Sequence, residues 1–195
     1  MSFGSLSGPA IAALNGGGKL AGALHNTGEG GISQYHLQGG DLIWQIGTAY
    51  FGCRDAQRPF SLDQLKKSLV GKPIRALEIK LSQGAKPGCG GMLPAAKITP
   101  EIAAVRGIPQ GKDCASPTHH AEFHDVDSML DFVEMLADAT GLPVGIKSAV
   151  GEIDFWSQLA YQMAAKGYRD GATCLHRPRG HAVQTWHEQC VPGVR

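Results

Sequence analysis

The chain has 195 residues, of which 43% are hydrophobic and 18% are charged, and this composition excludes a disordered protein. No apolar run approaches the ~20 residues of a membrane span, and a formal net charge of +1 argues against nucleic-acid binding driven by bulk charge. We therefore expect neither a nucleic-acid nor a membrane partner. Because no basic region followed by an apolar stretch opens the chain, no secretory signal is visible and the sequence predicts a cytoplasmic location.

Short apolar segments alternate with amphipathic ones through residue 166. The apolar segments predict strands at residues 2–6, 42–48, 76–81 and 143–148. The amphipathic segments predict helices at residues 9–22, 62–70, 100–106, 127–140 and 152–166. Strands that alternate with helices indicate parallel βα units, so we expect an α/β fold with functional groups at the carboxyl ends of the strands.

Two helices carry specific signals. Ser61 and Gln64 stand at the spacing of a capping box, in which each side chain satisfies the other's backbone N–H group. In the last helix the apolar spacing predicts four inward-facing side chains, namely Ile153, Trp156, Leu159 and Met163.

Five cysteines occur in the chain: Cys53, Cys89, Cys114, Cys174 and Cys190. None form a C-x-x-C pair and their gaps match no zinc or iron–sulfur spacing, so no metal site is predicted. Their odd number without a secretory signal indicates a reducing compartment, and we expect ordinary core or surface thiols.

Polar segments, most of them glycine-rich, lie beside the strands, at residues 2–5, 26–31 and 82–91 and at Lys147–Ser148. Backbone amides beside glycines can hold a phosphate or the edge of a heterocycle. Lys86 and Lys147 add positive charge there. The pattern favours an anionic, ring-bearing ligand, of which flavin mononucleotide (FMN) is one example.

Five segments carry a family resemblance: MSFGSLS, HNTGEGG, QIGTAYFGCR, EIKLSQGAKPGCGGMLPAAK and GLPVGIKSAVG. They resemble the FMN-binding synthase domain of the glutamate synthases, most closely the short form without a fused glutaminase. The resemblance runs from residue 1 to residue 166. It implies a (β/α)8 barrel, also called a TIM barrel, of which we expect the first four or five βα units here.

The resemblance also implies a reaction. In that family, reduced FMN delivers a hydride to 2-iminoglutarate, formed from 2-oxoglutarate and ammonia, and the product is L-glutamate. A 3Fe–4S cluster relays electrons to the flavin. An oxidoreductase of this kind would need an electron donor or reductase subunit, and a separate glutaminase subunit is one source of ammonia.

The cofactor-binding residues follow from the matching motifs. Met1 and Ser2 would present backbone atoms to the flavin, and Asn26 would lie near its ring. Gln83 and Lys147 would contact the pyrimidine side, where a cation stabilises the negative charge of reduced flavin.

The expected catalytic residues are Lys147, Lys86 and Glu78. Lys86 would hold a carboxylate of 2-oxoglutarate as a point charge. Glu78 is either a structural partner of a lysine or a catalytic carboxylate. His119 and His120 resemble a family loop near the site, although paired histidines are more often solvated or hydrogen-bonded than ligands.

The chain departs from the family pattern in three ways, which together indicate a fragment. It begins at the first barrel strand, and residue 1 is not the cysteine that a glutaminase uses as nucleophile. Residues 167–195 do not match the family's phosphate-binding loop, and a shifted reading frame or a truncated gene would give such an irregular tail. The cysteines of the 3Fe–4S cluster have no counterpart.

Two alternatives remain at this point. One is another FMN-dependent barrel oxidoreductase, such as one that acts on 2-hydroxy acids, which the absence of a clear histidine at a strand end disfavours. The other is an inactive remnant of the domain.

Overall fold

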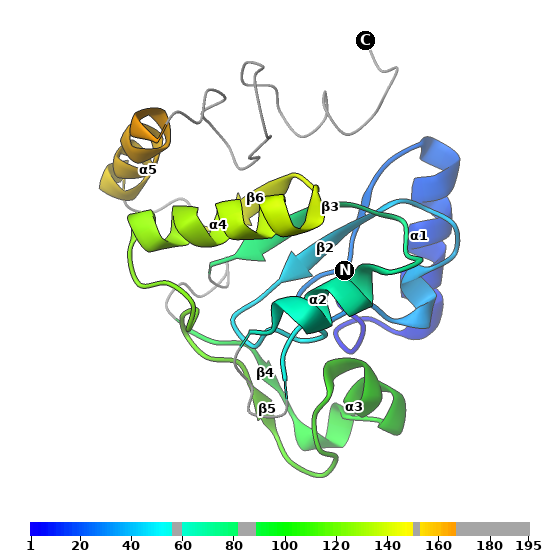
Figure 1. The fold of residues 1–195 in the computed structure, drawn as a ribbon. Coiled ribbons are helices and arrows are strands. Elements are labelled where there is room, and N and C mark those ends of the chain that lie inside the picture. The colour runs from blue at the N-terminus through cyan, green and yellow to red at the C-terminus, as the bar shows by residue number, and fades with distance from the viewer. Residues whose placement is uncertain (56–59, 82–88, 150–152, 167–195) are drawn as a thin grey trace.

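A four-stranded parallel sheet forms the centre of the fold (Figure 1). The computed structural model describes residues 1–55, 60–81, 89–149 and 153–166. The strands of the sheet are β1 (His25–Asn26), β2 (Leu42–Ile46), β3 (Ile74–Lys80) and β6 (Val144–Lys147), in the order β1-β2-β3-β6. Every pair is parallel, as the alternation of segments predicted.

Five α-helices accompany these strands in the described residues: α1 (Gly8–Ala21), α2 (Leu62–Leu69), α3 (Pro100–Arg106), α4 (Val126–Thr140) and α5 (Ile153–Ala165). Short 3₁₀ turns occupy Gln34–His36 and Ala95–Lys97. Strands β4 (Met92–Leu93) and β5 (Cys114–Ala115) pair as an antiparallel ribbon that lies with α3 to one side of the sheet (Figure 1). None of the helices in the described ranges is long and apolar enough to cross a membrane.

The main core lies between the sheet and helix α4. All five residues of β2 are buried, which is typical of a parallel strand covered on both faces. Trp44, Leu77 and Ile79 of the sheet pack in one cluster with Met129 and Leu136 of α4. A second cluster joins the start of the chain to the β4–β5 lobe, and it contains Phe3, Leu93, Ile98, Ile102 and Ala103.

The strand predicted at residues 2–6 is wrong. Phe3 and Leu6 form an isolated bridge around a tight turn, in which the Ser2 carbonyl accepts hydrogen bonds from Ser5 N at 3.1 Å and Leu6 N at 3.2 Å. Gly4 adopts a φ of +101°, which breaks an extended strand. The turn instead brings Ser2 back toward the carboxyl ends of the sheet strands.

The sequence did not predict β1, β4 and β5, because each of these strands has only two residues. Two residues carry no measurable alternation of apolar and polar side chains. Each of these short strands depends on a neighbour that lies far away in the sequence.

Two local predictions need correction. Ser61 Oγ accepts from Gln64 N at 3.3 Å, but Ser61 N donates to the Cys53 carbonyl at 2.9 Å, so the Gln64 side chain does not close the capping box.

Ile153 is 76% exposed, whereas Leu159 and Met163 are buried as expected. At about 100° per residue, Ile153 lies roughly 120° around the helix from Leu159.

Gly90 is tested by alanine substitution. A Cβ atom at Gly90 would collide with the carbonyl oxygen of Ser116 and lie 2.9 Å from its carbonyl carbon. Gly90→Ala should therefore open the β4–β5 ribbon and lower the free energy of unfolding in urea. The matched control is Gly17→Ala, because a Cβ there meets nothing within 4 Å. That change should raise stability by about 0.5–1 kcal/mol. Equal changes in the free energy of unfolding for Gly90→Ala and Gly17→Ala would contradict the close approach of Gly90 to Ser116.

Candidate functional site

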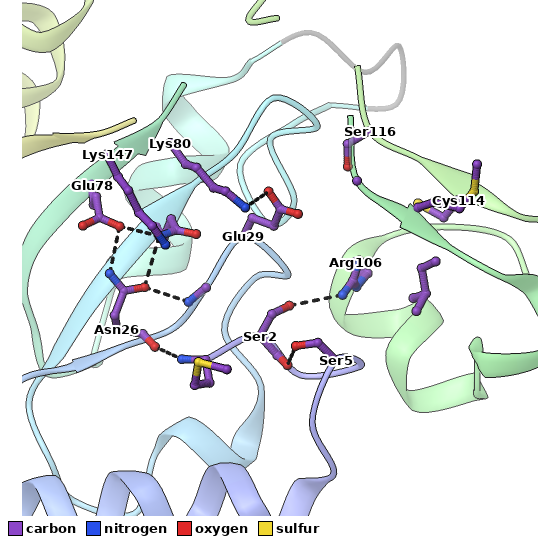
Figure 2. Close-up of a pocket in the computed structure, with 16 residues that line it drawn as sticks. Ser2, Ser5, Asn26, Glu29, Glu78, Lys80, Arg106, Cys114, Ser116 and Lys147 are labelled. Carbon is purple, nitrogen blue, oxygen red and sulfur yellow. Dashed lines mark hydrogen bonds and ion pairs between the residues drawn. The ribbon is translucent and has the colours of Figure 1, made fainter. Parts of the chain in front are cut away.

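A cavity of about 510 Å³ lies where the strands of the parallel sheet end (Figure 2). Side chains from β2, β3 and β6 line one side, and the β4–β5 ribbon with α3 lines the other. The polar residues that line it are Ser2, Ser5, Asn26, Glu29, Gln45, Glu78, Lys80, Arg106, Ser116 and Lys147. Its volume falls within the range of small-molecule sites.

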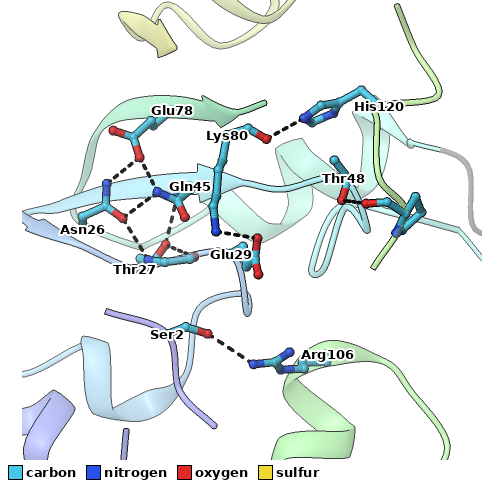
Figure 3. A network of polar contacts seen from close by, with 12 residues as sticks. Ser2, Asn26, Thr27, Glu29, Gln45, Thr48, Glu78, Lys80, Arg106 and His120 are labelled. Carbon is cyan, nitrogen blue, oxygen red and sulfur yellow. Dashed lines mark hydrogen bonds and ion pairs between the residues drawn. The ribbon is translucent and has the colours of Figure 1, made fainter. Parts of the chain in front are cut away.

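Three polar side chains from neighbouring strands form a network on the sheet side of the cavity (Figure 3). Glu78 Oε1 accepts hydrogen bonds from Asn26 Nδ2 at 2.9 Å and from Gln45 Nε2. Asn26 Oδ1 in turn accepts from Gly28 N at 2.9 Å. Parallel register places Gln45 directly opposite Glu78, so the sheet itself aligns the two side chains. The network fixes the orientation of the Asn26 amide at the cavity wall.

Lys80 and Glu29 form an ion pair across the cavity wall. Lys80 Nζ lies 3.0 Å from Glu29 Oε2, and the two side chains are 11% and 19% exposed. Of the two alternatives for Glu78, the lysine partner is not found among the described residues, since Glu78 pairs with amides and the lysine on the same strand pairs with Glu29.

Lys147 ends β6 next to Lys80, its register partner on β3. Figure 2 shows its side chain directed toward Asn26 and Glu78. Among the described residues no carboxylate oxygen lies within 4 Å of Lys147 Nζ. Its positive charge is therefore available to a ligand in the cavity.

Arg106, the last residue of α3, places a buried guanidinium on the opposite side. The residue is only 7% exposed, and its Nη2 donates to Ser2 Oγ at 3.2 Å and to the Phe3 carbonyl at 3.1 Å. The guanidinium also lies over the Phe51 ring, 5.1 Å from its centroid. Burial lowers the pKa of Arg106. No carboxylate of the described residues pairs with it, so an anion in the cavity would gain a strong partner.

His36 holds the start of the chain at the cavity. Ser33 N donates to His36 Nδ1 at 3.1 Å, so the proton of the neutral ring lies on Nε2, which donates to the Met1 carbonyl at 2.9 Å. Burial lowers the pKa of His36 and keeps this ring neutral. Met1 and Ser2 therefore line the cavity because a buried histidine anchors their backbone.

The cavity unites five of the seven site residues predicted from the sequence: Met1, Ser2, Asn26, Glu78 and Lys147. Gln83 and Lys86 lie outside the described residues, so their roles remain predictions. Sequence reasoning missed Gln45, Glu29, Lys80 and Arg106. Glu29, Gln45 and Lys80 stand inside the quoted motifs. Nothing about Arg106 in the sequence distinguishes it from an ordinary residue near the end of a helix.

The two histidines of the predicted loop have different environments. His120 is only 3% exposed and is hydrogen-bonded through both ring nitrogens, whereas His119 is exposed. Neither residue lines the cavity. No group of three or more potential metal ligands occurs among the residues that the structure describes.

Comparisons with known proteins identify a family and several relatives of this chain. A family model described as "Conserved region in glutamate synthase" matches residues 1–166. The chain is 43% identical over 190 residues to the glutamate synthase large subunit-like protein YerD of Bacillus subtilis (strain 168), an alignment that covers 96% of this chain and 36% of that protein. It is 36% identical over 152 residues to the archaeal-type glutamate synthase (NADPH) of Thermotoga sp. (strain RQ2), which covers 76% of this chain and 27% of that protein.

The archaeal glutamate synthase (NADPH) of Methanocaldococcus jannaschii is likewise 36% identical over 152 residues. The chain thus spans about a third of the length of the curated relatives it matches. The family match ends at residue 166, whereas the Bacillus alignment covers 96% of the chain and so reaches beyond it. The origin of residues 167–195 in a shifted frame or truncated gene stays a prediction.

The buried histidines predict a dependence of stability on pH. The pKa of His36 lies below its usual value of 6.5 in the folded chain, so the unfolded chain binds the proton more readily. The free energy of unfolding should be highest above about pH 6.5 and should fall as the pH decreases below that value. Urea unfolding at about pH 7.5 and about pH 5.5 measures the difference, and His36→Gln should reduce it. His124→Gln, at a side chain that is 87% exposed, is the control. An unchanged difference in His36→Gln would contradict the prediction.

Proposed function

Because the chain belongs to the glutamate synthase family, an oxidoreductase family, we propose that its cavity is the flavin and substrate site of a glutamate synthase domain. The reaction is the reduction of 2-iminoglutarate, made from 2-oxoglutarate and ammonia, to L-glutamate. The observation that carries the proposal is the convergence of Asn26, Glu78 and Lys147 with the buried cation Arg106 on one cavity at the strand ends.

We propose that the described sheet is part of a (β/α)8 barrel. Four parallel strands, with α-helices in the connections from β2 to β3 and from β3 to β6 and a polar cavity at their carboxyl ends, are features of that architecture. Strand β6 pairs only with β3 among the described residues, so its other edge is free to accept a further barrel strand.

The flavin end of the cavity is the side formed by Met1, Asn26 and Lys147. FMN, when bound, supplies the hydride for the reduction. Lys147 would stabilise the negative charge of reduced FMN, because its ammonium has no carboxylate partner among the described residues. Glu78 would act by orienting Asn26, since it accepts a hydrogen bond from the Asn26 amide.

The substrate end is the side formed by Arg106, Ser2 and Ser116. A dicarboxylate such as 2-iminoglutarate offers one carboxylate to the guanidinium, which presents several N–H donors in a fixed fork. A buried cation without a carboxylate partner is unfavourable, so the bound anion would also relieve that penalty. Glu29 also lines the cavity, and its negative charge is paired with the Lys80 ammonium at 3.0 Å and raises the pKa of Arg106, which burial lowers.

We propose that electrons come from a reductase subunit or another donor, and ammonia from a separate glutaminase subunit. The archaeal relatives carry NADPH in their names, which supports a pyridine nucleotide as the ultimate reductant. The family match favours this reaction over the oxidation of 2-hydroxy acids.

Ligand binding tests the proposal directly. Titration of the purified chain with FMN, followed by flavin fluorescence, should saturate at one FMN per chain. Calorimetric titration with 2-oxoglutarate should show binding, and 2-oxobutyrate should bind at least about tenfold more weakly because it lacks the second carboxylate. Arg106→Lys keeps the charge but loses the fork, so it should weaken 2-oxoglutarate binding. A chain that binds neither FMN nor 2-oxoglutarate would refute the proposal.

Lys147 offers a second test, because its ammonium has no ion-pair partner among the residues that the structure describes. Lys147→Met should leave the free energy of unfolding within about 0.5 kcal/mol of the original. The same change should weaken FMN binding about tenfold or more, and more for reduced than for oxidised FMN. Lys67→Met, at an exposed lysine of α2, is the matched control. Loss of stability with unchanged flavin binding would assign Lys147 a structural role instead.

A further inference from the structure

His120 is buried beside the end of β3, where Figure 3 shows its ring next to the Lys80 carbonyl, and both of its ring nitrogens have partners. Nε2 lies 2.9 Å from the Lys80 carbonyl, and Nδ1 lies 2.9 Å from the Tyr50 hydroxyl. A carbonyl oxygen only accepts, so the proton of the neutral ring is on Nε2 and the Tyr50 hydroxyl donates to Nδ1. Phe123 stacks on the ring at 4.7 Å between centroids, which fixes the plane of the imidazole.

Tyr50 fixes the orientation of the His120 ring through the hydrogen bond to Nδ1. Its hydroxyl accepts hydrogen bonds from Ala121 N at 3.2 Å and Glu122 N at 3.3 Å, so its own proton is left for His120. The residue is 2% exposed and has a φ of +50°, a conformation that a non-glycine residue adopts only when its surroundings hold it there. Burial raises the pKa of Tyr50, which keeps the hydroxyl a donor.

The Lys80 carbonyl lies where the β2–β3 ladder ends, and His120 is its hydrogen-bond donor there. β2 ends at Ile46, whose partner on β3 is Ile79, so Lys80 stands one residue beyond that ladder, while it still pairs with Lys147 of β6. A buried carbonyl without a donor is costly, and the imidazole takes the place of the missing strand N–H group. The backbone of Lys80 is thus held by His120, while its ammonium reaches Glu29 in the cavity at 3.0 Å.

We propose that His120 is a positioning residue that fixes the carboxyl end of β3 and thereby sets the place of the Lys80 ammonium in the cavity. Tyr50 acts through His120 by holding its tautomer. A shift of Lys80 would move Glu29 with it and change the charge that a dicarboxylate meets. The effect on ligand affinity rests on the proposed function, whereas the effect on Lys80 does not.

Two variants of His120 separate the positioning role from a purely structural one. In His120→Gln the side-chain amide reaches the position of Nε2 and can still donate to the Lys80 carbonyl. In His120→Asn the amide stops near the position of Nδ1 and cannot. The first readout is the ¹⁵N NMR signal of the Lys80 ammonium, assigned with Lys80→Met. The second is the affinity for 2-oxoglutarate, measured by calorimetry.

We expect the Lys80 signal to shift or broaden in His120→Asn and to be retained in His120→Gln. The affinity for 2-oxoglutarate should fall about tenfold in His120→Asn and stay within about twofold of the original in His120→Gln. An unchanged Lys80 signal in a folded His120→Asn variant would overturn the inference, even if its melting temperature falls. An equal loss of 2-oxoglutarate affinity in His120→Asn and His120→Gln would also overturn the inference.

The same two measurements give a different result if the proposed function is wrong. If the unmodified chain does not bind 2-oxoglutarate but the Lys80 signal responds as expected, the assignment of the ligand fails and the positioning role stands. If His120→Asn does not fold, Tyr50→Phe takes its place, because it removes the hydroxyl that orients His120, together with the acceptor of the Ala121 and Glu122 N–H groups. A Lys80 signal that is unchanged in Tyr50→Phe would then overturn the inference.

Discussion

The parallel pairing of β3 with both β2 and β6 is the constraint on which the cavity depends. Parallel strands end at the same edge of a sheet, so the register that sets Gln45 opposite Glu78 and Lys80 opposite Lys147 also gathers their side chains. A slip of one residue in either pair would turn every side chain of a strand to the other face. The apolar residues of the same strands hold the register, because they pack against α4.

The strand register places two of the charged side chains of the cavity, Lys80 and Lys147, next to each other. Lys80 is compensated by Glu29, whereas Lys147 and Arg106 have no carboxylate partner among the described residues. Cations placed this way favour an anionic ligand at both ends of the cavity. Two of the buried histidines, His36 and His120, add no charge, since burial lowers the pKa of both. They serve instead as N–H donors to the Met1 and Lys80 carbonyls, at 2.9 Å each.

The five site residues predicted from motifs and described in the structure lie together in the folded chain. Met1, Ser2, Asn26, Glu78 and Lys147 are far apart in the sequence, and all five line one cavity. Arg106 completes the site from α3, whose first turn is fixed by the Thr99 cap at 3.2 Å and whose end is fixed by Gly107.

The sequence by itself determined the α/β class, the long helices and strands β2, β3 and β6, because their apolar periodicity and end signals are local. Motif identity also determined the family and five of the residues that line the cavity. Only the tertiary structure decided the two-residue strands, the turn at Gly4 and the second partner of Ser61, which depend on contacts between distant segments. The same is true of the roles of Arg106 and His120. A buried cation and a neutral histidine are defined by the groups around them, and those groups meet only when the chain has folded.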